Sequence, residues 1–189
     1  MKIAQVAPLI ESVPPRLYGG TERIVSYLTE ELVKLGHDVT LFGSGDSITS
    51  AELAPCCTRA LRLDPTVRDI VPYFMLMIDK VRERAKEFDI FHFHIDFFHF
   101  PLFRSLAART LTTLHGRQDL ADLKPFYSRF GEMPFVRTTS ANHCRRQIML
   151  GRYTTAFRPT CIGRRLSGGA TSPSWGGFRR KSAPTARSE

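Results

Sequence analysis

The residues of this sequence that could do chemistry follow short apolar runs. Gly19 and Gly20 come after the apolar run 2–7 and before an amphipathic segment, an order that predicts strand, glycine loop and helix N-terminus. Glycines let the backbone approach a ligand, and the free N–H groups of a helix's first turn attract an anion, typically a phosphate. A pair of glycines is also compatible with a plain surface turn, so the surrounding elements must decide between the two.

Histidines mark a second segment. His92 and His94 alternate along the run 88–96, so they share one face of an expected strand, and Asp96 follows two residues later. A His-x-His strand can hold a metal ion. The sequence offers no third ligand at a characteristic spacing, so we predict no metal and favour a pocket wall or a hydrogen-bonded role. His92 is equally compatible with a purely structural strand histidine.

A third candidate, His115, ends the β-rich run 110–114 and precedes Gly116. In an open α/β sheet, ligands bind beyond the carboxyl ends of the strands. A histidine at such a strand end is therefore a candidate catalytic residue.

Alternating strands and helices are expected to position these side chains. Apolar residues at helical spacing predict a helix over 21–35, with Thr21 as its N-cap and Gly36 at its end. A strand over 37–43 then completes a β-loop-α-β unit. The remaining pattern predicts a long helix from 64–66 to about 87, strands over 88–96, 110–114 and 134–140, and helices over 100–107 and 124–130. Five strands alternating with helices predict an open, parallel, Rossmann-like α/β sheet with helices on both faces.

Length and composition limit the organisation of the chain. Its 189 residues, 42% of them hydrophobic, have room for one α/β domain and little else. The apolar runs are too short to span a bilayer and the N-terminus does not have the pattern of a signal peptide, so we expect a cytoplasmic protein with no integral membrane segment. The four cysteines have no paired metal-ligand spacing and predict free thiols.

The net charge of +9 is unevenly distributed along the chain. Residues 1–144 carry 17 basic and 17 acidic side chains, whereas residues 145–189 carry 10 basic side chains against Glu189 alone. We therefore place a domain boundary at 144 and expect 145–189 to be a basic, low-complexity, disordered tail. A basic tail could bind nucleic acid, but this one has few aromatic side chains for base stacking, and we expect no nucleic-acid partner.

Five motifs, in this order, resemble the N-terminal domain of family-four glycosyltransferases; they span residues 1–8, 18–23, 38–42, 89–94 and 112–116. The resemblance covers about residues 1–140. It implies a GT-B architecture, in which two Rossmann-like domains face each other across a cleft. It also implies that the N-terminal domain mainly binds the acceptor and the C-terminal domain binds the nucleotide-sugar. The sugar would be transferred with retention of configuration and without a metal, and the nucleotide-sugar would be a co-substrate rather than a cofactor.

The resemblance implies roles for individual residues. The backbone of Gly19 and Gly20 would lie beside the donor diphosphate, and His115 would be the catalytic residue near the transferred sugar. His94, Asp96 and Glu22 would lie at the acceptor pocket. Glu22 could instead serve only to complement the dipole of its own helix.

The sequence departs from the family at its C-terminal end, where members continue into a donor-binding domain. The genetic code permits codons for residues 153–161 and 170–184 that, read one nucleotide earlier, spell segments resembling the family's expected continuation. We therefore predict a truncated chain with a frameshift near residues 140–147, inactive alone. The alternative is a dinucleotide-dependent oxidoreductase on a Rossmann fold, which is disfavoured because the first loop lacks the G-x-G-x-x-G pattern.

Overall fold

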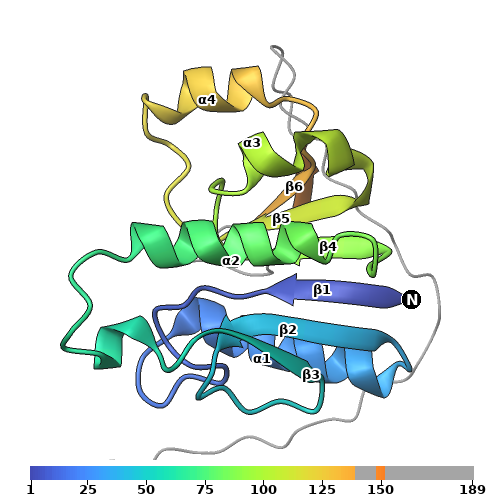
Figure 1. The fold of residues 1–189 in the computed structure, drawn as a ribbon. Helices are drawn as coiled ribbons and strands as arrows, with labels where there is room; N and C mark the ends of the chain where they lie inside the picture. Colours follow the sequence, from blue (N-terminus) through green and yellow to red (C-terminus); the bar gives the residue numbers. More distant parts are fainter. Residues whose placement is uncertain (139–147, 152–189) are drawn as a thin grey trace, which may run out of the picture.

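The computed structural model describes residues 1–138 and 148–151 of the chain. Its strands form one twisted sheet (Figure 1). They lie in the order β3-β2-β1-β4-β5-β6-β7, and β1 to β6 are parallel. This is the Rossmann order, in which the chain reverses direction across the sheet between β1 and β4. The strands are β1 (Lys2–Val6), β2 (Asp38–Ser44), β3 (Glu52–Cys57), β4 (Ile90–Phe93), β5 (Thr110–Leu114), β6 (Phe135–Thr138) and β7 (Ile148–Gly151).

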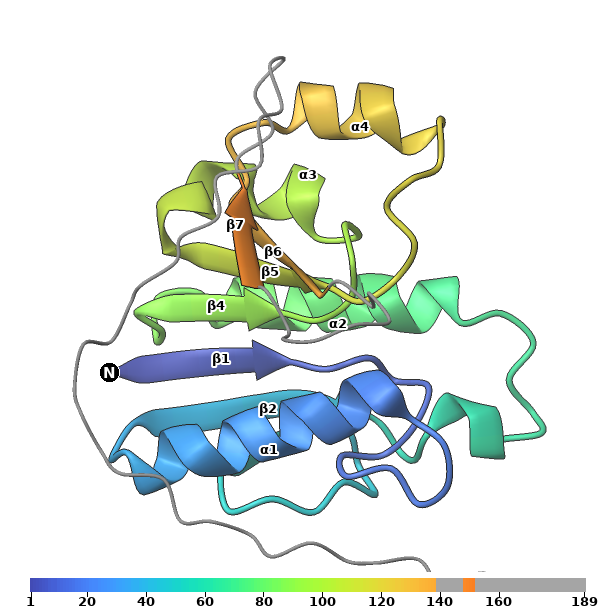
Figure 2. The ribbon, with the colours of Figure 1, turned by 180° about the vertical axis from the view of Figure 1, so that it is seen from behind.

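Helices cover both faces of the sheet, as the two opposite views show (Figures 1 and 2). Helix α1 (Gly20–Lys34) lies on one face, and α2 (Val71–Glu83) lies on the other together with α3 (Phe100–Phe103) and α4 (Leu123–Arg129). Two short 3-10 helices, η1 (Leu61–Leu63) and η2 (Arg104–Arg109), complete the elements. The predicted Rossmann-like sheet with helices on both faces is confirmed.

The core explains why the histidines share one face. Phe91 and Phe93 on β4 are fully buried in the large cluster beneath α2 and α3. Because side chains alternate along a strand, His92 projects to the opposite face, where Gln5 of the neighbouring strand β1 is paired with it in register. The rings of His92 and His94 are 4.2 Å apart, so the predicted shared face is confirmed.

Several predicted boundaries are wrong. The helix expected from 64–66 begins at Val71, because Asp64 instead accepts the N–H of Thr66 in a local turn, 3.0 Å away. The N-cap of α1 is Gly19 rather than Thr21. Strand β3 was not predicted at all. It contains Pro55 and pairs only with β2 at the sheet edge, where a missing N–H is tolerated.

Most of the predicted tail lies outside the described residues, and so does the expected frameshift segment near 140–147. Within the tail, the structure describes β7, which pairs antiparallel with β6. This strand spans Ile148–Gly151, where three consecutive apolar residues favour a strand. Within the described ranges, no helix has both the length and the apolar character that crossing a bilayer requires.

Candidate functional site

A cavity of about 680 Å³ lies at the crossover point of the sheet. The loop after β1, the first turns of α1, η1 and the residue after β5 all contribute to its wall. It thus brings Gly19, Gly20, Glu22 and His115 into one site, although almost a hundred residues separate them in sequence. The lining residues are Pro8, Ile10, Tyr18, Gly19, Gly20, Thr21, Glu22, Arg23, Ile24, Tyr27, Arg62 and His115.

The two glycines of the loop have different surroundings. A Cβ on Gly19 would lie 2.7 Å from Cβ of Pro15 and 2.9 Å from Oε2 of Glu22, so the loop has no room for one. A Cβ on Gly20 would meet nothing within 4 Å, because this residue borders the cavity. The first-turn amides of a helix have no carbonyl partner inside it, and such helix ends bind anions. In α1 the amide of Glu22 already donates to the carboxylate of the same residue, which leaves Gly20 and Thr21 as the candidate donors.

Substitution of the two glycines should therefore separate folding from binding. We expect Gly19→Ala to lower the free energy of unfolding by about 1–3 kcal/mol, because the added methyl group overlaps Pro15. Gly20→Ala should leave that free energy unchanged or slightly higher, because alanine is favoured in a helical turn. Urea titration measures both variants. Equal stability of the two variants would contradict the packing seen around Gly19.

Glu22 is a buried carboxyl group at the cavity wall, with 5% of its surface exposed. Burial raises the pKa of Glu22, and the nearby charge of Glu11 raises it further. Arg62 opposes this effect; its guanidinium lies 2.9 Å from the carboxylate of Glu11. Glu22 does stand in the first turn of α1, where a negative charge is favourable. Its position on the wall also places it beside a hydroxyl group bound in the cavity.

Three side chains form a series of hydrogen bonds that leads from the cavity wall into the sheet. Nε2 of His115 lies 3.0 Å from Nδ1 of His94, and Nε2 of His94 lies 3.1 Å from Oε1 of Gln5. Gln5 is fully buried, and His94 is 3% exposed. His94 was predicted at the rim of the acceptor pocket, but the structure places it beneath His115, from where it reaches the cavity only through that ring.

Their surroundings hold His94 and His115 neutral. Burial lowers the pKa of His94 well below its usual value, and the neighbouring His92 and His115 lower it further. Burial also lowers the pKa of His115, against the opposing charge of Asp96. Near pH 7 the His115 ring is therefore an uncharged imidazole, which can accept a hydrogen bond or a proton.

Asp96 fixes the backbone that carries His115. Its φ of 51° lies in the left-handed region, and its Oδ1 accepts the N–H groups of His115 at 3.3 Å and Gly116 at 3.4 Å. A Cβ on Gly116 would lie 3.2 Å from Oδ2 of Asp96, so the turn packs tightly against this carboxylate. Asp96 was predicted at the acceptor pocket; it does not line the cavity, and it holds the turn that does.

Two other histidines have structural partners. His92 donates to or accepts from the hydroxyl of Thr113 at 2.8 Å, and burial lowers its pKa to about 4. His99, which the sequence interpretation did not consider, stacks on Phe93 at 3.7 Å and pairs with Thr112 at 3.0 Å. The phenylalanines on both sides of His99 in the sequence could have indicated that its ring is buried. Among the described residues, no three His, Cys, Asp or Glu side chains gather in a way that suits a metal ion.

Sequence reasoning also missed Gln5 and Arg62. Gln5 could have been found as the one amide inside an apolar central strand. No sequence pattern indicated that Arg62 lines the cavity, because it lies in η1, which follows the unpredicted strand β3.

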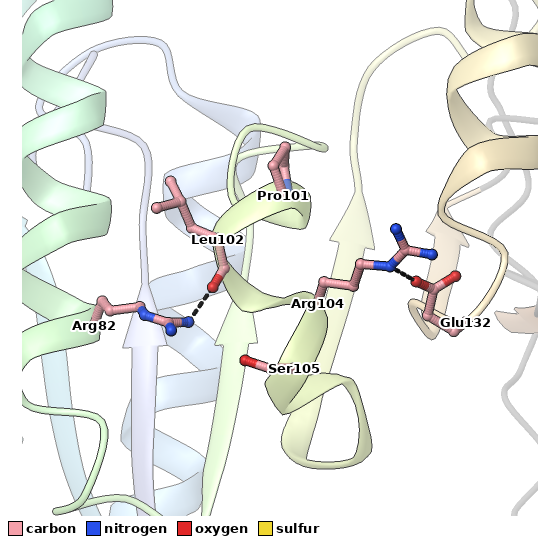
Figure 3. Close-up of a pocket in the computed structure, with 6 residues that line it drawn as sticks. All are labelled: Arg82, Pro101, Leu102, Arg104, Ser105 and Glu132. Carbon is pink, nitrogen blue, oxygen red and sulfur yellow. Dashed lines mark hydrogen bonds and ion pairs between the residues drawn. The ribbon is translucent and has the colours of Figure 1, made fainter.

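A second cavity, of about 590 Å³, lies between the end of α2, the α3–η2 segment and the turn before β6 (Figure 3). Arg82 donates to the carbonyl of Leu102, and Arg104 pairs with Glu132, so both guanidinium groups already have partners. Arg82 is at the end of α2 and Glu132 precedes β6, which places this cavity near the amino ends of the strands. Ligands of such sheets bind at the carboxyl ends, so we assign the site to the first cavity.

Comparison with solved structures gives two examples of partial similarity. AviGT4, a glycosyltransferase involved in avilamycin A biosynthesis, matches 74% of this chain at 18% identity with a TM-score of 0.37. This chain spans 32% of the length of AviGT4. The C-terminal domain of the coenzyme A biosynthesis bifunctional protein CoaBC matches 80% of this chain and 81% of its own length, at 11% identity and a TM-score of 0.46.

A search of curated protein sequences gave no match. The sequence model described as Glycosyltransferase Family 4, however, matches residues 18–156, which is well over half of the chain. That range includes the glycine loop and His115. The chain therefore belongs to glycosyltransferase family 4.

Proposed function

We propose that this chain is the acceptor-binding domain of a GT-B glycosyltransferase that moves a sugar from a nucleotide-sugar to an acceptor with retention of configuration. The observation that carries the proposal is the single cavity joining the α1 N-terminus, Gly19 and Gly20 to His115. At one edge of the sheet, the helix N-terminus is suited to bind a diphosphate, and the neutral imidazole beside it is suited to contact the reacting sugar. The family match removes the support for the oxidoreductase alternative.

The proposal assigns each wall of the cavity a task. The amides around Gly19 and Gly20 bind the donor diphosphate, and His115 contacts the transferred sugar or the attacking hydroxyl. Glu22 binds an acceptor hydroxyl from the buried end of α1. His94 and Asp96 act through His115, from its ring and its backbone respectively.

The donor-binding half of the enzyme would lie outside the domain that the described residues form. We propose that a frameshift near residues 140–147 separates this chain from that half, because shifted readings of 153–161 and 170–184 resemble the family's continuation. Resequencing the gene across the codons for residues 135–189 tests this directly. An unchanged reading frame without a downstream donor domain would contradict it.

The 189-residue chain alone should show no sugar transfer, because a two-domain cleft must hold donor and acceptor together for catalysis. Its affinity for a nucleotide-sugar should be on the order of millimolar, since one helix N-terminus supplies few phosphate contacts. Release of nucleoside diphosphate from a panel of uridine and guanosine diphosphate sugars measures turnover. The frame-restored enzyme is the positive control, and measurable turnover by the isolated chain would refute the proposed division of labour.

A further inference from the structure

We propose that Gln5 and His94 are positioning residues that hold His115 in one tautomer, with the proton on Nε2 and a free lone pair on Nδ1. His115 then meets a ligand hydroxyl in the cavity as a hydrogen-bond acceptor. Only the identity of that hydroxyl, as part of a sugar donor or acceptor, rests on the proposed function. The tautomer itself follows from two buried side chains, Gln5 and His94, and from the partly buried ring of His115.

The assignment of protons starts at Gln5. Its Oε1 is a carbonyl oxygen and can only accept, so the proton at the 3.1 Å contact belongs to Nε2 of His94. A neutral imidazole carries one N–H, so Nδ1 of His94 has a lone pair. That nitrogen lies 3.0 Å from Nε2 of His115, which must therefore donate. The single N–H of neutral His115 is thus used, and its Nδ1 remains unprotonated.

The backbone around these rings makes the arrangement specific. Gln5 lies on β1, between β2 and β4 in the sheet, and His94 directly follows β4, where its N–H donates to the carbonyl of Val6 at 2.9 Å. His115 directly follows β5, and Asp96 accepts its N–H. Both the ring and the main chain of His115 are therefore fixed before any ligand binds, which is what preorganises a polar group.

Gln5 matters more for the hydrogen bonds to His94 and His115 than for the stability of the fold. Its side chain is fully buried, and among the described residues its Nε2 has no hydrogen-bond partner. A buried amide with only one of its two polar groups hydrogen-bonded stabilises the fold little more than an apolar side chain of similar size. The contact of Oε1 with His94 is what an apolar replacement would remove, so a role in positioning can be separated from a role in folding.

The test is the tautomer of His115 in the full 189-residue chain, read from two-bond proton–nitrogen correlations of its ring at about pH 7.5, above the usual histidine pKa. The wild-type chain should show a single tautomer protonated on Nε2. Gln5→Leu removes the oxygen that accepts the proton on Nε2 of His94. The His94 ring should then carry its proton on Nδ1 and donate it to Nε2 of His115. The majority of His115 should then be protonated on Nδ1, while the urea midpoint changes little.

Thr113→Val is the matched control, because it removes the partner of His92 and leaves the three-residue chain intact. It should leave the His115 tautomer unchanged. Assignment of the His115 signals comes from their loss in His115→Gln. A wild-type ring protonated on Nδ1, or a tautomer that Gln5→Leu does not alter, would overturn the proposal. If Gln5→Leu fails to fold, Gln5→Met and the wild-type measurement still decide, and neither requires sugar transfer.

Discussion

His115→Ala in the complete two-domain enzyme is expected to lower kcat by roughly a hundredfold or more, the usual scale for a positioned polar group that acts in a transition state. The expectation rests on the place of His115 in the cavity, on its neutral ring and on the two contacts that fix it. An interaction made mainly in the transition state should lower kcat and kcat/KM together.

His37→Ala is the control for this variant, because His37 lies in the connection between α1 and β2, at the opposite edge of the sheet from the cavity. It should retain wild-type kinetics. Initial rates over a range of donor and acceptor concentrations separate kcat from KM for both variants. An unchanged kcat in His115→Ala would make His115 a structural histidine and leave the glycine loop as the only assigned part of the site.

The domain should lose stability steeply as the pH falls below about 6.5, the usual pKa of a histidine in an unfolded chain. Burial lowers the pKa of His92 to about 4 and those of His94 and His99 well below 6.5. Between these limits the unfolded chain binds protons that the folded chain excludes, so acid favours unfolding. His92 alone corresponds to about 3 kcal/mol over that window.

Urea unfolding at about pH 7.5 and about pH 5 measures this effect, because the first pH lies above the ordinary histidine pKa and the second lies below it. His99→Phe should flatten the pH dependence, because it removes a buried titrating ring outside the cavity and keeps an aromatic group against Phe93. A free energy of unfolding that stays constant between the two pH values would contradict the buried, neutral state of these histidines.

The sequence alone predicts that Gly19, Gly20 and His115 lie at one edge of the sheet. Each follows an apolar run that predicts a strand, and the carboxyl ends of parallel strands meet at one edge of a sheet. The alternation along 88–96 likewise predicted that His92 and His94 share a face, because the side-chain period of a strand is two. These predictions depend only on local periodicity and on the rules of parallel sheets.

The remaining features depend on tertiary packing that local patterns do not contain. Whether His94 lies at a rim or beneath another ring depends on burial by neighbouring strands, which separates it from the cavity surface. Arg62 reaches the wall only because β3 adds to the sheet edge, and Pro55 obscured that strand in the sequence. Asp96 acts through a left-handed backbone conformation that its sequence neighbours do not indicate.

The most direct test of the glycosyltransferase site is a titration of the isotope-labelled 189-residue chain with uridine and guanosine diphosphate sugars, followed by backbone amide shifts. We expect the largest shifts at Gly19, Gly20 and His115, and none at Arg82 or Arg104 around the second cavity. Saturation should require millimolar ligand, as expected for a helix N-terminus with few phosphate contacts. Shifts centred on Arg82 and Arg104, with none at the glycine loop, would contradict the assignment of the site.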